Sequence, residues 1–115
     1  MLNIASLNPD QFRIDLRVKV IELIVSLETK HEQSDAIIHI YEYLVADDTG
    51  CIVLNTKSEL QIDSVYDIEH AYTETVEGYL RLYATDIGLS SSNQLDGINT
   101  QNNRSAILFA RKLHY

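Results

Sequence analysis

Residues 47–50 read Asp-Asp-Thr-Gly, and two chemically different interpretations suit this short stretch. An aspartate on such a turn can work as an acid or a base when a second copy of the chain brings its own aspartate close, so that the two carboxylates share one proton. The same residues also suit the tight end of a β-hairpin, because Gly50 tolerates a positive φ and Asp47 or Asp48 can accept hydrogen bonds from the turn.

The catalytic interpretation describes a retropepsin-like aspartic protease, which has about the length of this chain and works as a homodimer. Such a protease has two apolar residues before Asp-Thr-Gly, a small residue after it, a glycine-rich flap, and a late glycine followed by Arg or Asn. In this sequence Asp47 precedes Asp48, Cys51 follows the turn, no glycine-rich flap is present, and Gly88 is followed by Leu89. We therefore expect a hairpin end and keep the protease as a remote alternative.

A second chemical pattern lies in residues 79–85, which read YLRLYAT. In a strand, Tyr79, Arg81 and Tyr83 lie on one face, whereas Leu80 and Leu82 lie on the other. Two tyrosines around an arginine suit the stacking of bases with a cation beside a phosphate. The alternative is that the tyrosines cover a solvated strand with their hydroxyl groups in water.

Other chemistry is poorly represented. Four histidines are scattered along the chain: His31, His39, His70 and His114. None has a cysteine or carboxylate partner at metal-ligand spacing. The single cysteine excludes an internal disulfide, and neither a glycine-rich phosphate loop nor a nucleophile elbow is present. We expect a protein that is not an enzyme and that uses no metal and no cofactor.

Composition limits the possibilities further. The 115 residues are 45% hydrophobic, which predicts one domain over residues 1–115. No basic and apolar leader is visible, and no apolar stretch approaches the roughly 18 residues that cross a bilayer, so we expect a soluble intracellular protein without a membrane partner. The net charge of -8 means that any binding to nucleic acid needs a local basic groove, or stacking in place of charge.

The first long apolar run predicts the strand that positions these groups. Up to Val20 every second residue is apolar, and from Ile21 the apolar residues continue in the opposite phase. Such a slip indicates a β-bulge or a bend. A long first strand that changes its inward face is what a small closed barrel requires, since this strand turns a corner and pairs with two neighbours.

The rest of the chain continues the β pattern. Further strands are predicted at 37–46, 51–56, 67–75 and 79–85, with a hairpin turn at 76–78 and a short helix or irregular crossover at 58–65. Residues 90–103 predict a mobile polar loop, and residues 105–114 predict a closing strand, or a helix as the less favoured choice. This order describes an all-β, five-stranded Greek-key barrel of the OB-fold type, which binds oligonucleotides or oligosaccharides.

Two stretches carry a family resemblance. VADDTGCIVL and AYTETVEGYLRLYATDIG resemble the corresponding hairpins of OB-fold single-strand DNA-binding proteins, nearest to the B subunit of the sensor of single-stranded DNA complex and to replication protein A-like OB domains. The resemblance covers about Phe12 to Gly88. It implies a single-stranded nucleic-acid-binding subunit, DNA or RNA, of a repair, replication or telomere-type complex in the nucleus.

The resemblance also implies site residues. Tyr72 and Tyr83 occupy two of the base-stacking positions of the family, whereas Lys57 replaces a tryptophan, Val76 a phenylalanine and Glu77 a basic residue. Lost stacking partners cost about 1–3 kcal/mol per base. The predicted nucleic-acid-binding residues are Tyr72, Tyr83, Tyr79, Arg81, Lys57, Tyr43 and Lys30.

The predicted strand 37–46 indicates a second possibility. Ile38 and Ile40 fall on one face and Tyr41 and Tyr43 on the other, although a barrel strand needs only one apolar face. The second apolar face predicts that the outer side of the strand is covered by stacked bases, by a terminal segment or by a partner protein. The alternative function is therefore an OB-fold scaffold with weak or no nucleic-acid binding. Its predicted interface residues are Ile38, Ile40, Tyr41 and Phe109.

Overall fold

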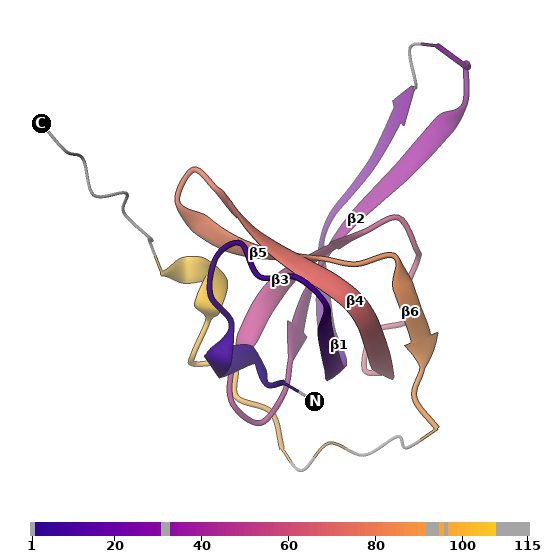
Figure 1. Cartoon of the computed structure of the whole chain (residues 1–115). Coiled ribbons are helices and arrows are strands. Elements are labelled where there is room, and N and C mark those ends of the chain that lie inside the picture. The colour runs from indigo at the N-terminus through magenta and orange to yellow at the C-terminus, as the bar shows by residue number, and fades with distance from the viewer. Residues whose placement is uncertain (1, 31–32, 92–94, 96, 108–115) are drawn as a thin grey trace, which may run out of the picture.

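The computed structural model describes residues 2–30, 33–91, 95 and 97–107. Its elements follow the alternating sequence pattern closely, and Figure 1 shows their arrangement. The strands are β1 (Ile14–Lys30), β2 (Ile37–Ala46), β3 (Cys51–Thr56), β4 (Val65–Val76), β5 (Tyr79–Tyr83) and β6 (Asp86–Leu89). Two single-turn 3₁₀ helices, η1 (Ile4–Ser6) and η2 (Arg104–Ala106), lie near the ends of the described chain.

Five of the strands close into a ring. The order is β1-β2-β3-β5-β4, and β4 pairs back with β1, which leaves β3 and β5 as the only parallel neighbours among the described strands. This is the OB-fold arrangement, so the predicted all-β five-stranded barrel is confirmed. The crossover between β3 and β4 is irregular, with no helix over residues 57–64. No helix among the described residues is long and apolar enough to span a bilayer.

The long first strand bends where the apolar phase slips. β1 pairs with β4 over Ile14–Lys19 and with β2 from Lys19 onward, and its register with β2 shifts between Val20 and Glu22 and again between Leu23 and Val25. Before the first bulge every second residue is buried, and in β1 as described no residue after Val20 is buried. The predicted bend at Val20 and Ile21 is confirmed.

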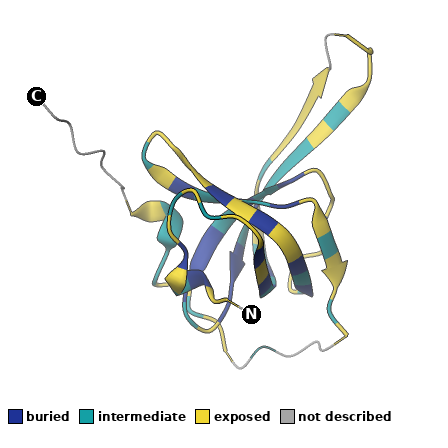
Figure 2. Ribbon diagram, viewed as in Figure 1, coloured by how far each residue is buried: buried dark blue, intermediate teal, exposed yellow. Residues whose placement is uncertain are grey.

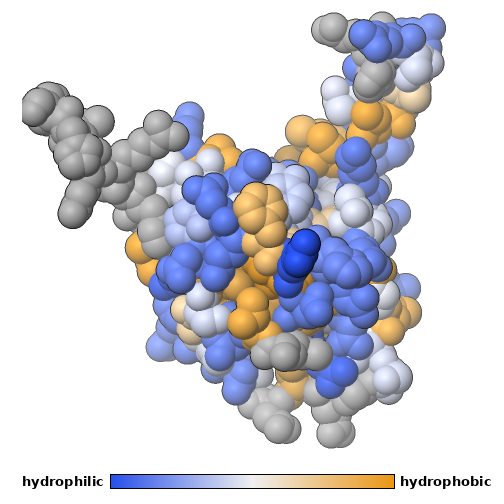
Figure 3. All heavy atoms as spheres, viewed as in Figure 1, coloured by the Kyte–Doolittle hydropathy of each residue, from blue (hydrophilic) through white to orange (hydrophobic). Residues whose placement is uncertain are grey.

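Beyond the bulges the β1–β2 pair extends past the end of β3 as a two-stranded arm, residues 27–30 and 37–40 (Figure 1). Within these two ranges no residue is fully buried, as Figure 2 shows. Large apolar side chains are exposed on the arm, and Figure 3 shows apolar residues gathered at its base. The exposed residues are Leu27 and Ile37 on the arm, and Leu23 and Ile24 in the part of β1 that leads to it.

The Asp-Asp-Thr-Gly turn joins β2 to β3 and is a structural junction. Asp47 is buried, and its carboxylate accepts hydrogen bonds from the backbone N–H groups of Ile4, Thr49 and Gly50 and from the Thr49 hydroxyl. Asp48 is exposed. These donors all belong to the chain itself, so the buried carboxylate serves the fold. The hairpin prediction is confirmed, although Gly50 does not adopt the positive φ that the sequence allowed. The aspartic-protease alternative is wrong because the barrel is an OB-fold.

The same turn also holds the segment 99–103. The Cys51 N–H donates to the Asn102 carbonyl at 2.9 Å, the Asn99 N–H donates to the Asp47 carbonyl at 2.8 Å, and the Asn102 amide donates to the Thr49 carbonyl. The final part of the predicted mobile loop 90–103 is therefore docked. It is held because amide and backbone groups of its asparagines pair with the turn.

Three elements differ from the sequence-based expectations. β4 is longer than predicted at both ends, and the predicted strand 79–85 ends at Tyr83, after which β6 forms a new pair with β4. At the C-terminal side, residues 104–106 form a 3₁₀ turn in place of the favoured strand, and the Ser105 hydroxyl donates to the Leu80 carbonyl of β5 and accepts from the Val53 N–H of β3. The remainder of the predicted closing element, including Phe109, lies outside the described residues.

Candidate nucleic-acid interface

The outward face of β4 and β5 brings two predicted residues together. Tyr72 and Tyr83 are directly opposed in the register, with ring centroids 5.2 Å apart and ring planes within 10° of parallel. Cross-strand aromatic pairs of this kind stabilise a sheet while one side of the rings stays at the surface. Burial, reinforced by the nearby Glu74 carboxylate, raises the pKa of the Tyr83 hydroxyl above its ordinary value, so this phenol stays neutral at physiological pH.

A pocket of about 170 Å³ opens beside the two rings. Its lining combines ring, hydroxyl, amide, imidazole and ammonium groups, which suits a planar ligand with hydrogen-bonding edges. The lining residues are Asn55, Thr56, Lys57, His70, Tyr72, Tyr83, Ala84 and Thr85. Strands β3, β4 and β5 and the residues that follow them supply these groups, so the barrel itself positions the pocket.

The cationic side chains around this face differ in how accessible they are to a phosphate group. Arg81 lies on the outward face of β5 as predicted, but Glu42 of β2 holds its guanidinium in an ion pair. Lys57 is exposed at the pocket and, among the described residues, forms no ion pair. A phosphate can therefore reach Lys57 directly, whereas Arg81 is already neutralised.

An aromatic residue that was not predicted as a binding residue joins the tyrosine pair. The ring of Phe12 lies 6.3 Å from that of Tyr72, with the planes 22° apart. Phe12 lies before β1, outside any predicted strand, and it is in phase with the inward residues Ile14 and Leu16, so alternation does not mark it as a surface ring. Its position depends on hydrogen bonds between Gln11 and Thr73 of β4, which are 62 residues apart.

Other predicted binding residues lie elsewhere. Tyr43 is only 2% exposed, and its hydroxyl accepts a hydrogen bond from the Leu60 N–H, so it is a core residue and its prediction as a binding residue is wrong. The misassignment has a physical reason, because both faces of its strand are apolar. Lys30 lies on the arm, 3.2 Å from Asp35, and Tyr79 lies exposed at the β4–β5 hairpin end.

Of the predicted protein-interface residues, Tyr41 lies where β2 pairs with β3, and Ile38 and Ile40 fall on the arm. Ile38 and Ile40 lie on one face of β2, since they oppose Thr29 and Leu27 in the register. Tyr41 lies on the other face, and its ring stacks on both Tyr43 and His39. The three predicted interface residues within the described range are all half-buried.

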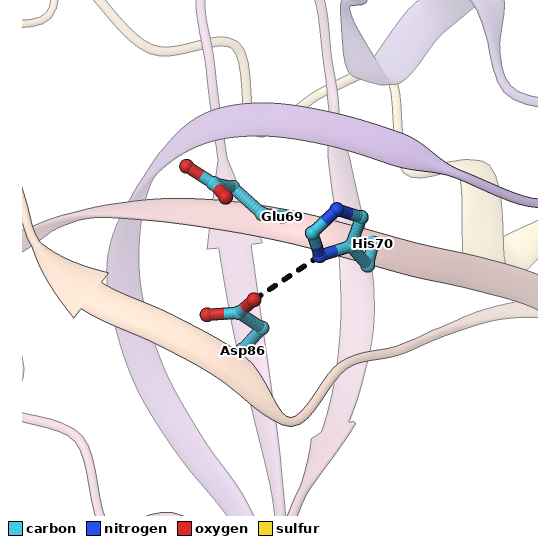
Figure 4. Close-up of side chains that lie close together, drawn as sticks. All are labelled: Glu69, His70 and Asp86. Atoms are coloured by element: carbon cyan, nitrogen blue, oxygen red, sulfur yellow. Dashed lines mark hydrogen bonds and ion pairs between the residues drawn. The ribbon is translucent and has the colours of Figure 1, made fainter.

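A polar cluster lies at the β4–β6 edge near the pocket. Possible metal-ligand atoms of Glu69, His70 and Asp86 lie within 4.8 Å of one another, and His70 Nδ1 lies 3.1 Å from the Asp86 carboxylate (Figure 4). Both Glu69 and His70 are exposed on β4, and His70 has φ of 57°. This cluster could not be predicted because β6 was not predicted. All three groups are exposed, and of them only His70 lines the pocket, so the two carboxylates make the neighbouring β4–β6 edge acidic.

The barrel and this face define an OB-fold binding domain. The model of the family of Ssb-like single-stranded DNA binding proteins with an OB fold matches residues 7–90, so the chain belongs to that family. No curated protein matches the sequence.

Two solved structures are similar in fold. A hypothetical protein from Arabidopsis thaliana has a TM-score of 0.76 and 19% identity over 99% of this chain and 88% of its own. The second OB-fold domain of replication protein A from Methanococcus maripaludis has a TM-score of 0.64 and 15% identity over 81% of this chain and 97% of its own. Both support the OB fold.

Proposed function

We propose that this protein binds single-stranded nucleic acid, with DNA the preferred ligand, on the outward face of β4 and β5. The observation that carries the proposal is the Tyr72–Tyr83 pair at the edge of a pocket with Lys57 on its lining. Family membership supports it, because the family is described by single-stranded DNA binding. A place in a nuclear repair, replication or telomere-type complex is part of the same proposal and rests on the resemblance alone.

Stacking contributes most of the binding free energy in this proposal. The chain has a net charge of -8, Glu42 pairs with Arg81, and the β4–β6 edge is acidic, so few phosphates can be neutralised. Each stacked base contributes about 1–3 kcal/mol without requiring a particular base. We therefore expect modest affinity, little sequence preference and a weak dependence on salt.

Anisotropy titrations of labelled oligothymidine with the purified chain, at low and physiological salt, test the proposal. Tyr83→Ala should weaken binding by about 1–3 kcal/mol, whereas Tyr83→Phe should retain binding because it keeps the ring. Lys57→Ala should reduce the salt slope by about 0.7, the value for one phosphate contact on a single strand. Oligouridine in the same assay distinguishes RNA from DNA. Absence of wild-type binding at low salt would overturn the proposal.

The arm favours a second candidate function, a protein-binding scaffold. Ile37 is 63% and Leu27 50% exposed, and such side chains on a projecting ribbon are typical of contacts with another protein. Leu27→Ser and Ile40→Ser together should leave oligonucleotide affinity unchanged if the arm serves proteins only. A loss of oligonucleotide binding in this double variant, with the fold intact by circular dichroism, would contradict the separation of the two surfaces.

A further inference from the structure

Phe12 is the most exposed of the large apolar side chains described, at 72%. A side chain this exposed buries little apolar area, so the hydrophobic effect does not account for the position of the ring. The ring is nevertheless placed on a well-anchored segment. The N–H of Gln11 donates to the Thr73 hydroxyl at 3.0 Å, the Thr73 N–H donates back to the Gln11 carbonyl at 3.0 Å, and the Thr73 hydroxyl donates to the Asn8 carbonyl at 2.6 Å.

The backbone around Phe12 adopts an uncommon conformation to present the ring. Asp10 has φ of 59° and Arg13 has φ of 57°, both in the left-handed region that residues other than glycine rarely occupy. Such conformations persist where surrounding interactions enforce them, and they concentrate at ligand-binding sites. The Gln11–Thr73 hydrogen bonds are the enforcing interactions in this segment.

The three rings form one row. Tyr83 neighbours Tyr72 at 5.2 Å and Tyr72 neighbours Phe12 at 6.3 Å, and both pairs are close to parallel. Exposure rises along the row, from the half-buried Tyr83 through Tyr72 at 37% to Phe12. The row starts at the pocket on β5, crosses β4 and ends on the segment before β1.

A cationic residue lines the pocket at one end of this row, and another adjoins the last ring in the sequence. Lys57 lines the pocket beside Tyr83, and Arg13 follows Phe12 in the chain. Both are exposed, and within the described part of the chain neither takes part in an ion pair. Unpaired cations flanking stacked rings are the combination that holds a single strand, since bases contact the rings and phosphates contact the cations.

We infer that Phe12 is a third base-stacking side chain, and that a single strand crosses the barrel from Tyr83 over Tyr72 to Phe12 with Arg13 contacting a phosphate. The inference rests on the proposed function and extends its site to the N-terminal segment. The ligand class is a single strand with at least three consecutive unpaired bases. Phe12 and Arg13 thus replace part of the stacking and charge that the chain lacks at Lys57, Val76 and Glu77.

The absence of tryptophan from the sequence makes a direct test possible. Phe12→Trp introduces the single indole of the chain, and titration with oligothymidine should quench its fluorescence over the same concentration range as the anisotropy change. Leu89→Trp on β6, an exposed position outside the row, is the matched control and should not be quenched. Equal quenching in the two variants, or no quenching in Phe12→Trp, would overturn the inference.

Two substitutions test the energetic role. Phe12→Leu keeps apolar volume but removes the ring, and should weaken oligothymidine binding roughly tenfold. Arg13→Ala should lower the salt slope by about 0.7, whereas Lys19→Ala on β1, a cation outside the row, should not. The thermal midpoint of Phe12→Leu should stay near that of the wild type because the side chain is exposed.

The outcomes separate the inference from the proposed function. If the wild type does not bind oligothymidine at all, the proposed function fails. If the wild type binds and Tyr83→Ala weakens binding, while Phe12→Leu binds as the wild type does, the inference alone is overturned and the strand does not reach the N-terminal segment.

Discussion

The Asp47 carboxylate accepts a hydrogen bond of 2.9 Å from the backbone N–H of Ile4, 43 residues earlier in the chain. The β2–β3 turn thereby holds η1 against the barrel. Asp47→Ala leaves several buried N–H groups without an acceptor and should lower the free energy of unfolding by about 3 kcal/mol in urea denaturation. Asp48→Ala, at the exposed neighbour, should change it by less than about 0.5 kcal/mol. Equal effects of the two substitutions would contradict the structural role of Asp47.

We also expect a substitution at Gly50, in the same turn, to destabilise the fold. A Cβ atom at Gly50 would lie 2.8 Å from the Asn102 carbonyl oxygen, which is closer than real Cβ atoms approach backbone. Gly50→Ala should therefore displace the docked segment 99–103 and cost about 1–3 kcal/mol. Gly88→Ala is the matched control, because nothing lies within 4 Å of its Cβ position. Thermal denaturation of both variants measures the difference, and a neutral Gly50→Ala would show that the segment is not fixed.

Glu42 controls how much of Arg81 a phosphate can reach. Glu42→Gln removes the carboxylate that pairs with the guanidinium, so oligothymidine should bind more tightly and the salt slope should steepen by about 0.7. Asp48→Asn removes one negative charge from a distant turn and controls for net charge. Anisotropy titrations over a range of salt concentrations compare the two. Equal changes of the salt slope in both variants would show that the overall charge of the protein, and not the Glu42–Arg81 ion pair, governs phosphate binding.

Stability should decrease at alkaline pH. Burial raises the pKa of the Cys51 thiol and that of the Tyr83 hydroxyl above their ordinary values, so the folded chain holds these protons to higher pH than the unfolded chain. The stabilising contribution is complete below the unfolded pKa values and is lost as pH rises through the folded ones. Urea denaturation at about pH 8 and about pH 10.5 should show the decrease. Tyr83→Phe should make this decrease in stability smaller. A wild-type free energy of unfolding that does not change with pH would contradict the burial of both groups.

Those features of the fold that depend on local alternation could be predicted from the sequence. The phase slip after Val20 located the bend in β1, and the inward Leu80 and Leu82 defined the outward face of β5. The Tyr72–Tyr83 pair was predicted as one site because the resemblance placed both residues and the alternation placed Tyr83 there. These features could be predicted because successive side chains of a strand point to opposite faces, and the spacing is visible in the sequence.

Features that depend on tertiary hydrogen bonds could not be predicted. Tyr43 lies in a strand with apolar residues on both faces, and its burial and its hydrogen bond with the Leu60 N–H show which side is inside. Phe12 is positioned by Thr73 on β4, which no local pattern connects to it. The docked segment around Asn102 resembles a polar linker in the sequence. Its amide and carbonyl groups pair with a turn about 50 residues away, and no local pattern shows this pairing.

We also expect the turn at Asp47 to affect the kinetics of unfolding. Contacts that join residues more than 40 positions apart close large loops, and loop closure of this size is entropically costly until the barrel around it has formed. We expect the fastening of η1 and of residues 99–103 to the turn to form after the rate-limiting step of folding. Weakening these contacts should then accelerate unfolding more than it slows folding and so shorten the lifetime of the native barrel.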